Sequence, residues 1–555
     1  MKRKIFIGAA WPYANGSLHL GHISSLIGGD ILARYFRLKG DKVLYVSGSD
    51  SHGTPVVLKA ETEKTSPEEV AKKYHGELKD TFLKGLKFSY DIYTNTTTKN
   101  HEKVVQEIFL ALYKKGLLYI KKQSLPYCPK DKRFLPDRYV EGECPNCHFK
   151  NARGDQCDNC GDLLDPEQLI NPVCKICSTK PVWKDTEHFF LKLTALAPKL
   201  KVWVKKAKGW RANALNFTKK FLETGLQDRA VTRDIEWGVA IPLPGYESKK
   251  IYVWFDAVCG YLSASKEYSE LNREDDLWGE FWRKKDSTHY YIHGKDNILF
   301  HSIIWPAMLV GSGSLHLPDK IFSSEYFTLE RQQFSTSRNW AVWLPDFLSR
   351  YEADTLRYYL TVNGPETSDA DFSWDEFQAR VNKELIGNFG NFIHRTLTLI
   401  EKHFPGGIEY PKNDKTKILK LAEEKFTFVG ETIEKGRFRE ALKHVFELAE
   451  EGNRFLATAA PWQKIKSQKK EAAEDLWAAA ATIHCIAVLI EPFLPKTSQK
   501  ILKLLNVKSD KISWKPPEKT KYTIVSPTLL FVKIEDKQIE IEKQRLEAEV
   551  KNANV

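Results

Sequence analysis

The stretch that decides the fold is residues 4–46, which reads KIFIGAA (4–10), WPYANGSLHLGH (11–22), ISSLIGGDILARYFRL (23–38), KGD (39–41) and KVLYV (42–46). Its first residues alternate around Ile5 and Ile7 as a buried strand does, and apolar residues then recur at helical spacing as far as Leu38. A second strand is predicted at residues 42–46. Strand, helix and strand in succession form a right-handed parallel crossover unit. Because ligands bind beyond the carboxyl ends of such strands, we expect residues 11–22 and 47–55 to line one crevice.

The rest of the chain shows where this sheet continues and where it ends. Strand-like runs at residues 250–255 and 288–293 are each followed by helical spacing, so the sheet is predicted to resume after a long insertion. Beyond about residue 378 the pattern becomes helical, with predicted helices at 381–404, 417–456 and 471–494. The fold class is therefore α/β with a parallel sheet, followed by an all-α domain. Residues 528–555 predict a short apolar strand and then a charged helix.

Composition excludes several classes of protein. The 555 residues are 42% hydrophobic and 28% charged, values that are typical of globular chains and exclude disorder and collagen. The 84 Lys+Arg exceed the 72 Asp+Glu by 12, a sign that favours a polyanionic partner, although solubility alone explains it equally well. The apolar run 5–13 is broken by Pro12 and lacks a signal-peptide cleavage pattern. The apolar stretch 476–490 is too short to span a bilayer, so we expect a soluble cytoplasmic protein with no membrane partner.

Seven of the nine cysteines lie between Cys128 and Cys177, which favours a metal over disulfides in a cytosolic chain. Three Cys-x-x-Cys pairs occur there, and each is typical of half of a tetrahedral zinc site. Spacing alone leaves open which pairs combine. A second site requires Asp131 as its fourth ligand. Ligand chemistry favours this role and the alternative, in which Asp131 is a solvated turn residue and the second site is empty or weak, equally. The predicted zinc ligands are Cys128, Asp131, Cys144, Cys147, Cys157, Cys160, Cys174 and Cys177.

A His-x-x-His pair, His19 and His22, stands at the predicted start of the first helix, with Gly21 between the two histidines. The positive end of a helix favours an anion, and glycine lets a base or phosphate approach the backbone. Such a pair is by itself more typical of a helix cap or half of a metal site. Here, however, it follows a strand in a crossover unit, which favours a nucleotide site.

At these residues the sequence resembles the class I aminoacyl-tRNA synthetases, whose HIGH motif corresponds to residues 19–22. Further motifs resemble the methionyl-tRNA synthetase family: YVSGSDSHGTP (45–55), YVWFDA (252–257), GKD (294–296) and FHSIIWP (300–306). The cysteine stretch resembles the zinc-knuckle insertion of that family. The resemblance runs from about residue 4 to about residue 495, and its motifs occur in family order.

The resemblance implies a Rossmann-type catalytic domain and roles for named residues. Those implied to bind methionine are Trp11, Tyr13, Asp50, Trp254, Ala257, Tyr261, His301 and Trp305. Those implied to bind ATP are His19, Gly21, His22, Gly294, Asp296, Phe334 and Thr336, with Mg²⁺ accompanying the ATP. It also implies the nested zinc pairing, in which Cys144, Cys147, Cys157 and Cys160 form one site and Cys128, Asp131, Cys174 and Cys177 form the other.

The second class I signature, KMSKS, corresponds here to QFSTSR (333–338), so both lysines are absent. In the family the second lysine stabilises the phosphates as pyrophosphate departs, and Thr336 carries no charge. Arg331 and Arg338 lie on either side of Thr336 in the sequence and are candidates to replace the missing lysine charge. We therefore expect His19, His22, Thr336 and Arg338 to be the catalytic residues.

In the helical domain, Asn391 and Arg395 are four residues apart and Trp462 precedes a basic run. Their family counterparts read the anticodon, although a surface pair and a core tryptophan are the ordinary interpretations of these residues. The expected domains are a catalytic first half (1–116), a zinc-knuckle insertion (117–230), a catalytic second half (231–325), a stem-contact region (326–380), an anticodon-binding domain (381–530) and a charged helix (531–555).

The resemblance implies a methionine–tRNA ligase acting on ATP, L-methionine and tRNA(Met), either as a monomer or joined to a separate tRNA-binding or dimerisation subunit. Two alternatives stay open. One is a synthetase for another aliphatic amino acid, although those families usually carry a large editing insertion. The other is a tRNA-binding paralogue that no longer aminoacylates, for which the missing lysines are the only evidence.

Overall fold

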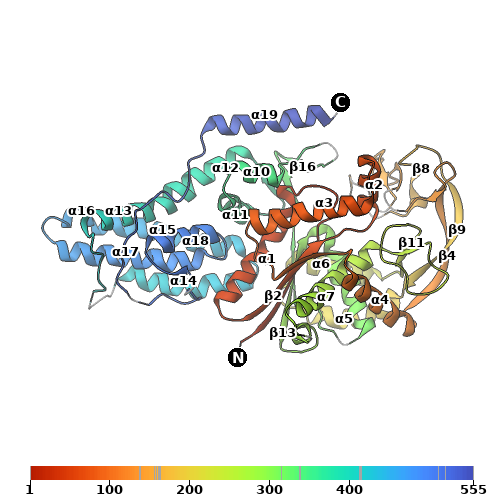
Figure 1. Ribbon diagram of the computed structural model, residues 1–555, viewed down its shortest axis with the longest axis horizontal. Helices are drawn as coiled ribbons and strands as arrows, with labels where there is room; N and C mark the ends of the chain where they lie inside the picture. Colours follow the sequence, from red (N-terminus) through yellow and green to blue (C-terminus); the bar gives the residue numbers. More distant parts are fainter. Residues whose placement is uncertain are drawn as a thin grey trace.

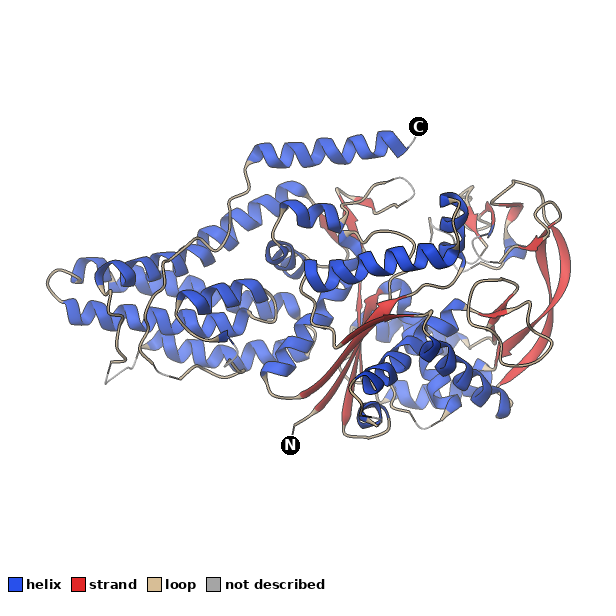
Figure 2. Cartoon of the chain, viewed as in Figure 1, coloured by secondary structure: helices blue, strands red, loops and turns tan. Residues whose placement is uncertain are grey.

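The computed structural model describes residues 2–136, 139–154, 157, 159–160, 164–274, 276–313, 315–336, 339–411, 416–509, 512–518 and 520–553. It is elongated, with a mixed α/β half and a helical half side by side (Figure 1). Strands gather in the centre of the molecule and at the end away from the helical half (Figure 2).

The central sheet has five parallel strands in the order β14-β13-β1-β2-β3. Their bounds are β1 Lys4–Ala9, β2 Lys42–Ser49, β3 Ile92–Asn95, β13 Ser287–Gly294 and β14 Lys320–Ser324. Ile7 of β1 lies between Tyr45 and Tyr290 of its two neighbours. The strand order reverses between β1 and β13, so the ligand crevice is expected at their carboxyl ends. The predicted parallel sheet and its first crossover unit are confirmed.

Helices cover both faces of this sheet, which explains why β1 is almost continuously apolar. Ile5 and Ile7 belong to the core beneath α1, whereas Phe6 belongs to the core beneath α4 and α7. The helices of this half are α1 Leu20–Leu38, α2 Thr54–Glu63, α3 Pro67–Asp80, η1 Thr81–Gly85, α4 Lys99–Lys114, α7 Val253–Leu271, α8 Leu277–Trp282, η4 Lys295–Asn297, η5 Phe300–Ile304 and α9 Trp305–Ser312.

The prediction of a sheet strand at residues 250–255 is wrong. Only β12 (Lys250–Ile251) is extended, it pairs antiparallel with β11 outside the central sheet, and α7 begins at Val253. A short unbroken apolar run does not distinguish a strand from the first turn of a buried helix, and here the helix forms.

The insertion between β3 and β13 is built on a long antiparallel ribbon of β4 and β9. Its sheets have the orders β10-β9-β4-β5, β7-β6-β8 and β11-β12. The elements are β4 Leu118–Cys128, β5 Arg133–Phe134, β6 Val140–Glu143, β7 Ala152–Arg153, η3 Pro166–Gln168, β8 Ile170–Cys174, β9 Val182–Leu191, α5 Leu193–Lys205, α6 Ala212–Thr224, β10 Arg229–Ala230 and β11 Thr232–Arg233.

A connecting region joins the sheet to the helical half. It contains β15 Phe327–Leu329, β16 Gln332–Gln333, α10 Leu344–Arg350, α11 Ala353–Val362, β17 Ala370–Phe372 and α12 Trp374–Arg380. The helical half contains η6 Val381–Gly390, α13 Asn391–His403, α14 Lys417–Glu434, α15 Phe438–Ala459, α16 Pro461–Lys464, α17 Lys469–Ile490 and α18 Pro495–Leu504. The predicted all-helical region is confirmed, but residues 417–456 form two helices because Gly436 adopts a positive φ of 72°.

Helix α17 is the one helix of the described residues with the length and composition to cross a membrane. Within its apolar window, 83% of the residues are buried by the rest of the protein. Burial of this extent is typical of the central helix of a bundle.

The end of the chain differs in part from the prediction. No strand forms among residues 528–534, where Leu530 and Phe531 are buried while Leu529 and Val532 are largely exposed. This burial lacks the alternation that a half-buried strand requires. The charged helix is confirmed as α19, Asp536–Ala553, which lies apart from the bundle and is held by Glu542 to Arg350 (Figure 1).

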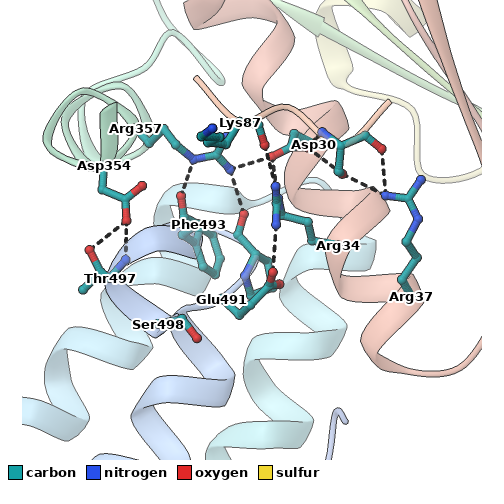
Figure 3. Close-up of polar contacts among 12 residues, drawn as sticks. Asp30, Arg34, Arg37, Lys87, Asp354, Arg357, Glu491, Phe493, Thr497 and Ser498 are labelled. Atoms are coloured by element: carbon teal, nitrogen blue, oxygen red, sulfur yellow. Dashed lines mark hydrogen bonds and ion pairs between the residues drawn. The ribbon is translucent and has the colours of Figure 1, made fainter. Parts of the chain in front are cut away.

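A buried polar junction joins α1, α11 and the loop between α17 and α18 (Figure 3). Asp30 of α1 pairs with Arg34 and with Arg357 of α11. The Arg357 guanidinium also donates to the carbonyl oxygens of Phe493, Pro492 and Leu86. The helix that begins at the His-x-x-His motif is thereby fixed to the helical half.

Candidate active site and metal centres

A cleft of about 2440 Å³ opens at the carboxyl ends of the sheet strands. Both segments predicted to line a crevice do so, through residues 11–13 and 15–18 and through Asp50 and Pro55. The cleft is also lined by residues of the insertion and by residues 333–336, 339 and 343.

The two histidines of the motif cap α1 with their side chains. His19 is the N-cap, and its Nδ1 accepts the backbone N–H of Gly21 at 3.1 Å. Nδ1 of His22 accepts the backbone N–H of His19 at 3.1 Å. Burial lowers the pKa of His22 to about 4, and burial together with His22 lowers the pKa of His19. Both rings are therefore neutral at pH 7, and because each Nδ1 is an acceptor, each proton lies on Nε2.

The loop that corresponds to the KMSKS signature packs directly on the His-x-x-His motif. The ring of Phe334 stacks on His19 with centroids 4.6 Å apart and planes 3° apart. A side chain at Gly21 would meet both rings at about 3 Å, so glycine is required for this stack. Backbone hydrogen bonds from Leu20 to Val342 and from Leu344 to Leu18 join the two segments. His22 lines the open cleft, whereas His19 lies beneath Phe334.

Thr336, which stands at the position of the second lysine, differs in its surroundings from Arg331, one of the two candidate replacements. Thr336 is exposed and lines the cleft. Arg331 is exposed, does not line the cleft, and donates its backbone N–H to Asp371 at 2.8 Å. Arg338 lies outside the described residues.

Most residues predicted to bind methionine meet on one side of the cleft. Trp254 stacks on Phe300 with centroids 3.8 Å apart and approaches Tyr13 edge-on. The hydroxyl of Tyr261 lies 2.7 Å from Nε2 of His301, whose Nδ1 contacts the carbonyl oxygen of Asn297. Those that line the cleft are Trp11, Tyr13, Asp50, Trp254, Ala257, Tyr261 and His301.

Two predicted residues lie behind the surface of the cleft. Trp305 is fully buried and donates its indole N–H to Tyr291 at 3.0 Å, so it supports the pocket without lining it. Gly294 ends β13 next to Asp296, which does line the cleft and accepts the hydroxyl of Tyr326 at 2.8 Å.

Three residues near Asp50 were not predicted as site residues. His52 and His101 both contact the fully buried carboxylate of Asp256, at 2.6 and 2.5 Å. His52 and Asp256 lie within the motifs of residues 45–55 and 252–257, which is a sequence signal. His101, from α4, carries no signal of this kind.

The insertion gathers its metal-ligand side chains into two groups. Cys144, Cys147, Cys157 and Cys160 form one group, Cys128, Asp131, Cys174 and Cys177 form the other, and within each the ligand atoms lie within 4.8 Å of one another. Ligands at 2.3 Å in a tetrahedral zinc site lie about 3.8 Å apart, so both groups fit zinc. The arrangement agrees with the nested pairing.

In the helical half, Arg395 of α13 lies over the ring of Trp462 of α16, 5.5 Å from its centroid. Trp462 is 38% exposed, so the core interpretation of this tryptophan is wrong. Asn391 is exposed one turn before Arg395 on α13. All three residues are thus accessible on one side of the bundle.

Comparisons with known proteins agree along the whole chain. A family model described as tRNA synthetases class I (M) matches residues 5–397, and one described as the anticodon binding domain of methionyl tRNA ligase matches residues 404–551. A methionine–tRNA ligase of Bacillus mycoides is 48% identical over 551 residues, covering 99% of this chain and 100% of the relative. One of Dehalococcoides mccartyi is 48% identical over 554 residues, covering 98% and 100%.

Among solved structures, the Mycobacterium tuberculosis methionyl-tRNA synthetase in complex with methionyl-adenylate has a similar fold, with a TM-score of 0.79, 23% identity and coverage of 96% of this chain and 100% of that chain. The parallel sheet, the histidine-capped helix and the capping loop define a class I aminoacyl-tRNA synthetase. Within that class, the chain belongs to the methionyl-tRNA synthetase family.

Proposed function

We propose that this chain is a methionine–tRNA ligase, which activates L-methionine with ATP and transfers the product to the 3′ end of tRNA(Met), in the cytoplasm. The observation that carries the proposal is the full-length identity of 48% to a methionine–tRNA ligase, combined with an intact cleft. In the first step the methionine carboxylate attacks the α-phosphorus of ATP and pyrophosphate leaves.

The histidines are assigned to the phosphates of ATP. Because both rings are neutral with the proton on Nε2, each offers one N–H donor at the positive end of α1. A neutral donor binds phosphate oxygens without a change of protonation as negative charge moves to the leaving group. Asp296, which lines the cleft, is assigned to the ribose hydroxyls, whereas neither Gly21 nor Gly294 lines it. Magnesium accompanies ATP and neutralises part of its charge.

The methionine side chain is assigned to the aromatic pocket. Trp254 and Tyr13 supply ring faces and edges, and a thioether beside a ring gains about 0.3 to 1.5 kcal/mol per contact. Tyr261 and His301 close the pocket and are held by their mutual hydrogen bond. Asp50 is the buried carboxylate that lines the pocket and is assigned to the substrate ammonium.

The two cysteine groups are assigned to structural zinc. All ligand positions of each group are filled by protein side chains, so no position remains for a substrate. The helix α2 packs against this module through Val57 and Leu58. Zinc would thereby stabilise one wall of the cleft.

The test is ATP–pyrophosphate exchange measured with methionine, leucine, isoleucine and valine, followed by aminoacylation of tRNA. We expect exchange with methionine about 10- to 200-fold faster than with the other three, because a misfit the size of one methylene in an apolar pocket costs about 1 to 3 kcal/mol. The branched side chains of leucine, isoleucine and valine also lack the thioether that contacts the rings. A faster rate of exchange with one of the other amino acids would show that methionine is not the preferred substrate. Absence of exchange with all four, in a folded protein that binds tRNA, would overturn the enzymatic function.

A further inference from the structure

The segments that meet at Asp50 also enclose a second buried carboxylate, that of Asp256. Asp256 stands in the first turn of α7, where the positive helix end favours a negative charge. Its Oδ2 accepts from Nδ1 of His52 at 2.6 Å, and its Oδ1 accepts from Nε2 of His101 at 2.5 Å. His101 and Asp256 are completely buried and His52 nearly so. We call these three residues the His–Asp–His array.

The array touches Asp50 through the backbone. His52 donates its backbone N–H to Oδ1 of Asp50 at 3.2 Å, while its ring is held by Asp256. The position of the Asp50 carboxylate therefore depends on a chain that runs from α4 through α7 to the loop after β2. Nδ1 of His101 contacts the hydroxyl of Ser263 at 2.8 Å, which anchors the far end of the chain.

The charge balance of this region is unusual. Among the described residues, neither Asp50 nor Asp256 has an ion pair with lysine or arginine. Two buried carboxylates without a fixed cation disfavour each other's ionisation and favour a ligand that brings one positive charge. Burial and the neighbouring Asp256 raise the pKa of Asp50. Burial opposes ionisation of Asp256, but the attraction of His52 and His101 outweighs it and lowers the pKa of Asp256 to about 2.

We propose that Asp256, held by His52 and His101, is a positioning residue that adds a second carboxylate charge behind the substrate ammonium and fixes Asp50 against it. This rests on the proposed function, because it assumes that the ammonium of methionine binds at Asp50. The other titratable groups that face the array are Cys259, which follows Asp256 by one turn of α7, and Glu267, which contacts Thr94.

The test is the dissociation constant of L-methionine between pH 5.5 and 8.5 for the wild type and Asp256→Asn, read from the fluorescence of the pocket tryptophans. The amide keeps the shape and can still bond to both histidines, so the variant removes mainly the charge. We expect methionine to bind about 10-fold more weakly to Asp256→Asn than to the wild type at the alkaline end of this range. Burial and Asp256 both raise the pKa of Asp50, and the variant removes the contribution of Asp256, so protonation of Asp50 weakens binding to the wild type at a higher pH than binding to the variant. We therefore expect the difference between the two dissociation constants to narrow as the pH falls.

Two controls distinguish the loss of the Asp256 charge from a general disruption of the site. The KM for ATP should not change in Asp256→Asn, and Glu270→Gln, which removes an exposed carboxylate near the far end of α7, should leave methionine binding and its pH dependence unchanged. Weakening by the same factor at every pH, or unchanged affinity, would overturn the charge role of Asp256.

A second variant keeps the proposal testable if Asp256→Asn does not fold. His101→Gln should weaken methionine binding by about 3-fold or more, because it loosens the carboxylate that it holds. A folded His101→Gln protein with wild-type affinity at every pH would also overturn the proposal. Absence of methionine binding by the wild type would overturn both the proposed function and the role of the array. If the dissociation constants of the wild type and Asp256→Asn change with pH in parallel, only the role of the array is overturned.

Discussion

The guanidinium of Arg357 and the carboxylate of Asp30 form an ion pair of 2.7 Å in which neither side chain is exposed to solvent (Figure 3). Asp30 lies on the helix that His19 caps, and Arg357 also binds the carbonyl oxygens of Phe493 and Pro492 in the helical half. The pair therefore connects the helix of the nucleotide site to the helical domain through one buried group.

Replacing Arg357 by methionine should lower the free energy of unfolding by about 3 to 5 kcal/mol, because Asp30 and three carbonyl oxygens lose a buried donor. Urea unfolding followed by circular dichroism measures this. The matched control is Lys84→Met, which removes a cation from the exposed pair with Asp80 and should cost less than about 1 kcal/mol. Equal effects of the two variants would contradict the role of the junction.

Sequence patterns predicted the parts of the fold whose periodicity is long. The strand at Ile5 and Ile7 and the following helix are confirmed because the sequence passes from a buried strand to a long amphipathic repeat at one clear turn. The prediction of a strand at residues 250–255 is wrong because the apolar residues there are too few to show a helical or strand period. The prediction of a strand within residues 528–534 is wrong because the buried residues, Leu530 and Phe531, are adjacent in an irregular segment and do not alternate as in a strand.

The candidate site was predictable where its residues lie in contiguous motifs, as His19 to His22 and Asp50 do. His101 was not predictable, because 155 residues separate it from Asp256 and only the packing of α4 on α7 brings them together. The stack of Phe334 on His19 could not be predicted for the same reason. Trp305 was expected in the cleft because an aromatic residue in a motif does not reveal whether it lines a pocket or supports one.

Loss of ligands from either cysteine group should remove one zinc and not two, because the groups share no ligand. Metal analysis of Cys157→Ser and Cys174→Ser should each show one equivalent less than the zinc-saturated wild type, and Cys485→Ser, far from both groups, should show no change. We expect the group with Asp131 to have the lower occupancy as purified, because a carboxylate replaces one thiolate. A single variant that releases both metals would show that the groups are not independent.

Trp462 should matter for tRNA and not for methionine activation. Its ring is accessible beside Arg395 at a distance from the cleft, and loss of one base stack costs about 1 to 3 kcal/mol. Trp462→Ala is therefore expected to raise the KM for tRNA by about 5- to 100-fold and to leave methionine-dependent exchange unchanged. Phe428→Ala, which removes another exposed aromatic ring of the helical half, is the control. If exchange falls as much as aminoacylation does, the assignment of Trp462 to the anticodon is wrong.

The last prediction concerns the charge that replaces the missing lysines of the loop. Thr336 lines the cleft without a charge, and Arg331 lies outside the cleft lining, so we propose that Arg338 neutralises the departing pyrophosphate. Arg338→Ala should slow adenylate formation by about 10- to 1000-fold in single-turnover kinetics, as loss of a transition-state donor does, with little change in methionine binding.

Two further variants decide whether the loop contains a substitute charge at all. Arg331→Ala is the matched control, and we expect a normal rate because its backbone, not its side chain, anchors the loop to Asp371. Thr336→Lys should leave the rate unchanged or raise it modestly, because a second cation adds little where one already acts. A normal rate for Arg338→Ala together with a strong acceleration by Thr336→Lys would mean that the wild-type loop has no substitute for the lysine, and that the phosphates depend on the neutral Nε2–H donors of His19 and His22 alone.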